Sequence, residues 1–285
     1  MNQSKMIAAL LGAVLLLSPA LAPIAVQAQT STKTKAGPTG SASSAKLPSV
    51  TKILADVAAA AGDKAAFTKI KTLVMRGTMT LSAQNLSGAM DIQMAFPDKI
   101  HVSQEIGGVG KFEQGYDGKQ GWSRDPLNGL RTLAGAELGQ MRRQADEVRS
   151  SDWHQLYSKA ELIGLRKVGA ESAYAVRLTP KRGGKPVIIY YDTRTKLPLR
   201  TDTIVETAQG AIPTQTFASD FRIVSGVMMP FKSRQVIGAT EVSLLYDRIE
   251  FNAPINESVF AKPTAVTTVA KPEAPKPEAP KPAAP

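Results

Sequence analysis

Residues 72–96 read TLVMRGTMTLSAQNLSGAMDIQMAF, and they contain two segments in which apolar residues alternate with other residues. From Leu73 to Leu81 every second residue is apolar or glycine, and threonine or arginine fills most positions between them. The same alternation returns from Met90 to Phe96. A period of two is typical of antiparallel strands buried on one face. The stretch therefore predicts a β-hairpin that turns near Asn85.

Strand patterns extend outward from this hairpin through a region of about 215 residues, enough for one large β domain. Short turns between successive strands force antiparallel pairing, because parallel strands need long crossovers. A sheet of about eleven strands should curl around its apolar face. The further strands are expected to begin at Ile100 and to cover 109–116, 119–124, 160–168, 173–179, 186–192, 198–206, 212–221, 228–237 and 240–251.

Helical patterns occur at two places. Before the first strand, Ser49 or Thr51 could cap a helix whose apolar stripe runs from Ile53 to Ala61. Between the two groups of strands, residues 136–148 have helical spacing, and a second short helix is expected around Trp153, Leu156 and Tyr157. The predicted fold is mainly β (α+β), a curled antiparallel half-barrel closed by a few short helices. Periodicity leaves open whether its interior is hollow or filled.

The termini predict an exported protein. Lys5 precedes an apolar run, and small residues follow up to Ala28, as in a cleavable signal peptide. We expect a signal peptide at 1–28, a disordered linker at 29–47, the folded domain at 48–262 and a disordered Pro-rich tail at 263–285. An uncleaved anchor is the alternative at the N-terminus. Because the chain has no cysteine, disulfides and lipidation at a lipobox are excluded.

The net charge is +11, which favours anionic partners. For an exported protein, lipid headgroups or an anionic envelope polymer are better candidates than nucleic acid, and transient contact with a membrane surface fits the same charge. A solvated basic surface without any ligand remains the alternative.

A search for catalytic patterns finds little. The chain has two histidines, His101 and His154, so a multi-histidine metal site is not available. The stretch from Gly107 to Lys111 lacks the glycine and the hydroxyl residue of a phosphate-binding loop, and we interpret it as a hairpin turn. We expect neither catalysis nor a cofactor. A hydrolase with an unfamiliar site near His154 is a weaker alternative.

Four methionines, Met75, Met79, Met90 and Met94, share the apolar faces of the two strands of the first hairpin, together with Phe96. Methionine is flexible and adapts to irregular ligands, but it also fills ordinary cores. The residues alone support both interpretations.

Five short strings, in this order and spacing, resemble the outer-membrane lipoprotein-sorting family (LolA/LolB-like proteins) over about residues 50–262. They are FPDK at 96–99, GYDGKQGW at 115–122, YYDTRTKLP at 190–198, SDFRIVSGVMMP at 219–230 and IEFNAPINESVF at 249–260.

The resemblance implies an incomplete antiparallel barrel with an apolar cavity for acyl chains, and it implies no catalysis and no cofactor. It favours a ligand-lining role for the methionines. Together with the order of the hairpins, it adds Trp122, Leu244 and Tyr246 to the expected lining. Two features depart from the family: the chain has no cysteine for a lipid anchor, and the linker and tail lie outside the resemblance.

The sequence thus predicts a monomeric periplasmic protein that binds a lipid or lipoprotein acyl chain, with a role in lipoprotein sorting to the outer membrane. The alternative is a non-catalytic envelope scaffold with a filled core, whose surface and tail contact the cell wall or other proteins.

N-terminal sequencing of protein recovered from its native envelope should give a start near Gln29 in the soluble fraction, because the signal pattern ends at Ala28. An intact Met1 in the membrane pellet would show instead that the segment is retained as an anchor.

Overall fold

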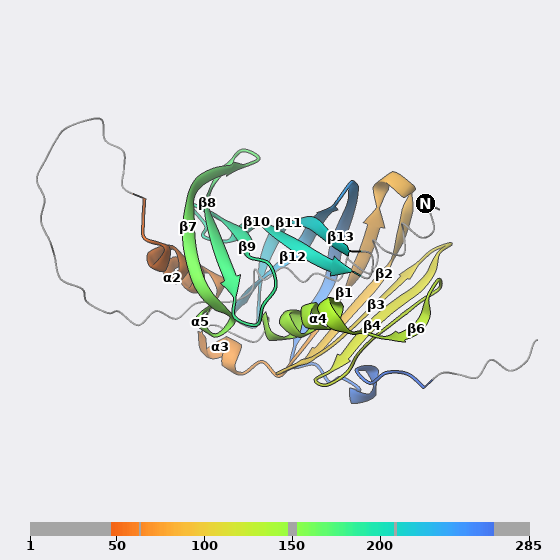
Figure 1. Cartoon of the computed structure of the whole chain (residues 1–285). Helices are drawn as coiled ribbons and strands as arrows, with labels where there is room; N and C mark the ends of the chain where they lie inside the picture. Colours follow the sequence, from red (N-terminus) through yellow and green to blue (C-terminus); the bar gives the residue numbers. More distant parts are fainter. Residues whose placement is uncertain (1–46, 63, 148–152, 208–209, 265–285) are drawn as a thin grey trace, which may run out of the picture.

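The computed structural model describes residues 47–62, 64–147, 153–207 and 210–264. Its strands form one antiparallel sheet of thirteen, in the order β6-β5-β4-β3-β2-β1-β13-β12-β11-β10-β9-β8-β7 (Figure 1). The sheet curls but does not close into a barrel, since β6 and β7 are its two edges. This confirms the predicted half-barrel class.

The strands follow one another with short connections except between β6 and β7. Their bounds are β1 Thr72–Leu81, β2 Leu86–Ala95, β3 Lys99–Ile106, β4 Gly110–Asp117, β5 Gly121–Asp125, β6 Gly129–Thr132, β7 Tyr157–Val168, β8 Glu171–Pro180, β9 Val187–Asp192, β10 Pro198–Thr207, β11 Gly210–Val224, β12 Val227–Ile237 and β13 Thr240–Phe251.

Two meanders make up the sheet, β1 to β6 and β7 to β13, and the pairing of β1 with β13 joins them. In this pairing Met79 lies opposite Leu244 and Met75 opposite Ile249, and the register shifts between Arg76 and Gly77. A shift of this kind bends the strand and increases its local twist. The first and last strands of the domain thus lie side by side in the middle of the sheet.

The helices are short, and none in the described part of the chain is both long and apolar enough to cross a membrane. Ser49 caps the first helix, as one of the two expected residues, by accepting a hydrogen bond from the Lys52 amide at 3.2 Å. The bounds are α2 Val50–Ala61, α3 Lys64–Thr68, α4 Gly135–Glu147 and α5 Trp153–Leu156, with 3₁₀ turns η2 Ser82–Gln84 and η3 Glu257–Val259.

Helices cover the concave face of the sheet at two places. At one end, α2 and α5 pack on β7, β8 and β9, and the apolar stripe of α2 that includes Ile53 and Val57 is buried there. Helix α4 connects the two meanders across the opening of the half-barrel (Figure 1). It is tied to β10, where Gln140 Oε1 accepts a hydrogen bond from the Glu206 amide at 2.6 Å.

Aspartates organise the turns in two of the strings that resemble the lipoprotein-sorting family. Asp117 accepts hydrogen bonds from the amides of Lys119 and Gln120, and Asp192 accepts them from the amides of Arg194 and Thr195. Such side-chain-to-backbone bonds specify tight turns. The strings are therefore scaffold features.

The fold differs from the sequence prediction in detail. The described residues form thirteen strands instead of about eleven, and the four-residue edge strand β6 was not expected. Strand β7 begins at Tyr157, which the sequence pattern assigns to the short helix before it. The expected signal peptide, the linker up to Lys46 and the tail from Ala265 onward lie outside the described residues.

Gly77 allows β1 and β13 to approach, and its replacement should unfold the domain readily. A Cβ atom on Gly77 would lie 2.0 Å from the Leu245 carbonyl oxygen and 2.8 Å from the Tyr246 Cα, and neither backbone atom can move alone. We expect Gly77→Val to lower the free energy of unfolding by about 3 kcal/mol, at the upper end of overpacking costs.

Gly107→Ala is the matched control, because a Cβ there would meet its nearest neighbour at an ordinary 3.8 Å. Urea denaturation of both variants would test the prediction. Equal midpoints for Gly77→Val and the wild type would show that the two strands do not approach as described.

Candidate ligand-binding face

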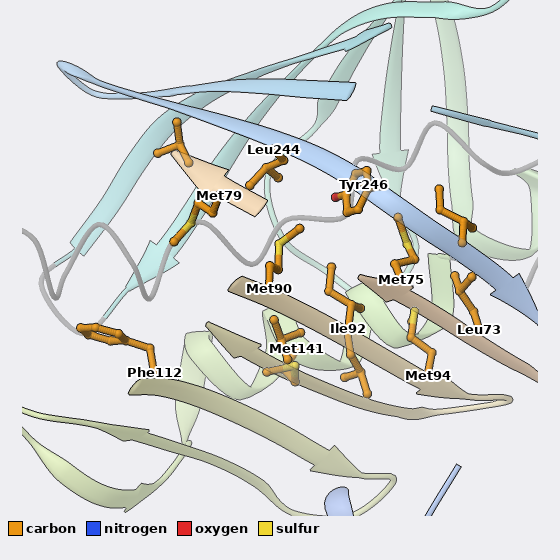
Figure 2. Close-up of a cluster of buried hydrophobic side chains, with 14 of the residues drawn as sticks. Leu73, Met75, Met79, Met90, Ile92, Met94, Phe112, Met141, Leu244 and Tyr246 are labelled. Carbon is orange, nitrogen blue, oxygen red and sulfur yellow. The ribbon is translucent and has the colours of Figure 1, made fainter. Parts of the chain in front are cut away.

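An apolar cluster occupies the concave face of the sheet between β1–β4 and β12–β13, and α4 contributes Met141 to it (Figure 2). Methionine is unusually frequent there, since six of the nine in the sequence belong to it. Their flexible thioether side chains suit a surface that must adapt to a ligand. The six are Met75, Met79, Met90, Met94, Met141 and Met229.

Strand register explains why these side chains share one face. Residues directly opposite each other in an antiparallel sheet project to the same side. Gly77 of β1 lies opposite Met90 of β2 on one side and Tyr246 of β13 on the other. Burial raises the pKa of the Tyr246 hydroxyl well above its ordinary value, so this ring is neutral throughout the physiological range.

Seven of the eight side chains that the sequence suggested for the lining lie together. Met75, Met79, Met90, Met94, Leu244 and Tyr246 are buried members of the cluster, and Phe96 packs against it half-buried.

Trp122 does not join them, and that part of the prediction was wrong. The β4–β5 hairpin places Tyr116 opposite Gly121 and Gly115 opposite Trp122. Tyr116 belongs to the concave cluster, so Gly115, the preceding residue on β4, and its register partner Trp122 lie on the outer face. The resemblance to the family located Trp122 in the correct hairpin but gave no information about its side of the sheet.

On the outer face, Trp122 is the centre of a second buried site. Its ring fills the space left by Gly115, where a Cβ would lie 2.3 Å from the indole Nε1. The indole Nε1 donates a 2.9 Å hydrogen bond to the Phe260 carbonyl oxygen. His101 lies beside it, with the ring centroids 5.8 Å apart. The C-terminal segment is therefore fastened to the outer face of the first meander.

Glu113 and His101 are the buried titratable groups of this outer site. Burial raises the pKa of the Glu113 carboxyl, but hydrogen bonds from Lys111 and Arg124 outweigh it and keep the pKa below its ordinary value. Arg124 Nε is 2.8 Å from Glu113 Oε2, and Lys111 Nζ is 2.8 Å from Oε1. The Glu113 carboxylate is thus paired with two basic side chains, and this ion-pair network has a structural role.

The described residues offer little for a metal or for hydrolysis. They contain no group of three His, Asp or Glu residues that could hold a metal ion. His154 is exposed and lies against the Trp153 ring, with centroids 3.8 Å apart.

Sequence reasoning missed Met141, Met229 and Gln104 as members of the concave face. The structure buries all three, with exposures of 3%, 0% and 1%. Gln104 had a signal that could have been used. It takes the polar place in the otherwise apolar series Ile100, Val102, Gln104, Ile106, so the period of two already assigns it to the buried side.

Comparison with known proteins identifies the fold. No protein-family model and no curated protein matches the chain. A LolA superfamily protein from Nitrosomonas europaea is 12% identical over 76% of this chain and 99% of its own, with a TM-score of 0.50. A DUF1329 family protein from Desulfovibrio piger is 13% identical over 70% of this chain and 96% of its own, with a TM-score of 0.48.

A putative outer membrane lipoprotein-sorting protein domain from Vibrio parahaemolyticus is also similar, at 12% identity over 67% of this chain and 89% of its own, with a TM-score of 0.43. At 12% identity, the likeness to the Nitrosomonas europaea protein concerns the fold alone. The chain shares its fold with this LolA superfamily protein, which agrees with the fold that the resemblance of the sequence strings implied.

His101 should make stability depend on pH. Burial lowers the pKa of its imidazole, although Glu113 and Asp91 act to raise it, and Lys111 and Arg124 add to the lowering. The unfolded chain therefore binds a proton more readily than the folded one, and stability is lost as pH falls through the ordinary histidine range near 6.5.

We expect the urea midpoint of the wild type to fall between pH 7 and pH 5, and His101→Phe to reduce that fall. The interval from pH 7 to pH 5 lies above the pH range in which Glu113 is protonated. The ion pairs of Glu113 with Lys111 and Arg124 should therefore stay intact. An identical pH profile in the variant would show that His101 does not titrate differently on folding.

Proposed function

We propose that this protein binds a lipid or lipoprotein acyl chain on the concave face of its half-barrel, in the periplasm, and that it is not an enzyme. The observation that carries the proposal is the concentration of six methionines in one cluster on that face. The fold that the chain shares with a LolA superfamily protein supports the same conclusion.

The chemistry of the face suits an acyl chain. Burying one methylene group contributes roughly 0.8 kcal/mol, so a chain of about twelve carbons gains on the order of 10 kcal/mol before ordering costs. Methionine side chains rearrange around such a chain with little strain. The concave cluster extends from β1–β4 across to β12 and β13, and Met141 of α4 meets it from the opening.

The export pattern of the N-terminus and the positive charge support an activity next to membranes. We propose that the protein acts as a monomer that contacts anionic membrane surfaces transiently and takes part in lipoprotein sorting to the outer membrane. The sequence contains no cysteine that could carry a lipid anchor, and we propose that the protein moves between membranes as a carrier.

A bulky side chain at Met90 should block the site without unfolding the domain. We expect Met90→Trp to bind a fluorescent fatty-acyl probe at least tenfold more weakly than wild type, while the melting temperature stays within a few degrees. The reason is that the indole ring occupies space that the acyl chain needs. In a filled core, the same ring would overpack the interior and lower the melting temperature.

Leu245→Trp is the matched control. Leu245 is the next residue on β13 after Leu244, it faces outward, and it is 44% exposed, so the same large ring is introduced away from the cluster. Its binding should equal that of wild type. If Met90→Trp melts far below wild type and wild type never binds the probe, the core is filled and the scaffold alternative replaces this proposal.

A further inference from the structure

Gln104 is a buried polar residue in an apolar part of the concave face. It lies on β3 between Met90 of β2 and Phe112 of β4 in the strand register. Its neighbours along the strand on the same face are Val102 and Ile106, each 1% exposed. A primary amide is thus surrounded within the sheet by four apolar side chains.

Both polar atoms of this amide lack a partner. Gln104 is 1% exposed, and neither its Nε2 nor its Oε1 has a hydrogen-bond partner in the structure. Burying an unpaired polar group is costly, and native proteins rarely retain one without a reason. A core that only needed filling would take leucine or methionine here, as it does at the neighbouring positions.

On the concave face, polar residues lie on the side of Gln104 that leads to the edge strand β6. On the same face, the row that starts at Val102 continues through Gln114 of β4 and Ser123 of β5 to Arg131 of the edge strand β6. Toward β1 and β2, in contrast, the face carries the methionines. An amphipathic ligand would therefore lie with its tail over β1 and β2 and its polar end toward β5 and β6, and Gln104 stands at the boundary.

We propose that Gln104 binds a secondary amide at the head of the acyl chain. The Nε2 group donates and the Oε1 atom accepts, so the complementary group must offer one acceptor and one donor. A secondary amide offers both through its C=O and N–H, whereas an ester offers acceptors alone. This inference rests on the proposed function and adds to it the class of ligand, an amide-linked acyl chain.

A matched pair of probes tests the inference. N-methyldodecanamide and methyl dodecanoate have the same length and differ in N–H against O at one position, and both can compete with the fluorescent fatty-acyl probe. We expect wild type to bind the amide about tenfold more tightly than the ester, a factor that corresponds to about 1.4 kcal/mol.

Gln104→Met removes the amide at nearly constant volume. The variant should bind both probes equally, with affinity for the ester retained, and without ligand it should melt no lower than wild type because an unpaired buried group has been removed. Gln93→Met is the control, since Gln93 of β2 faces outward, where its Nε2 donates to Asp91 Oδ1 at 2.7 Å. It should keep the preference for the amide.

The outcomes separate the two proposals. If wild type binds amide and ester equally, or if Gln104→Met keeps the preference, the role of Gln104 is refuted while acyl binding stands. A large loss of stability in ligand-free Gln104→Met would refute it as well, because the amide would then have a partner within the protein. If wild type binds neither probe, the proposed function itself fails.

Discussion

The pairing of the first strand with the last is the constraint on which the remaining structure depends. Strands β1 and β13 are separated by almost the whole domain in sequence, yet their hydrogen bonds turn two meanders into one sheet. Gly77 permits this approach, because any side chain there would meet the backbone of Leu245. The methionines of β1 and β2 thereby come to face Leu244 and Tyr246, which belong to the other meander, and a common concave face exists.

Much of the fold could be predicted because a period of two determines both the type of element and its buried side. The first hairpin, the capped opening helix and the helix that begins near Gly135 follow from local patterns. The four-residue strand β6 is too short to show a period, and the order of the strands depends on the long-range β1–β13 pairing. Local sequence contains neither kind of information.

The residues of the candidate face were likewise predictable from the sequence only in part. Met75, Met79, Met90 and Met94 were found by alternation within one hairpin. Trp122 was assigned to the lining from the order of the hairpins and the family resemblance, although its side depends on the register of the β4–β5 turn. A shift of one residue in that register reverses the side. Gln104 was visible in the alternation of β3, but its unpaired amide became apparent only when both neighbouring strands were in place. At Gln104 the buried place that the strand pattern assigns thus conflicts with the polarity of the side chain.

The central claim is that the concave face holds an acyl ligand, and native mass spectrometry of protein purified gently from its own envelope tests it most directly. The account predicts a population heavier than the polypeptide by the mass of one lipid or acylated molecule, which collisional activation releases and fragmentation identifies through its acyl chain. Protein that carries no such molecule, and that gains none when incubated with a lipid extract of the same envelope, would contradict the account.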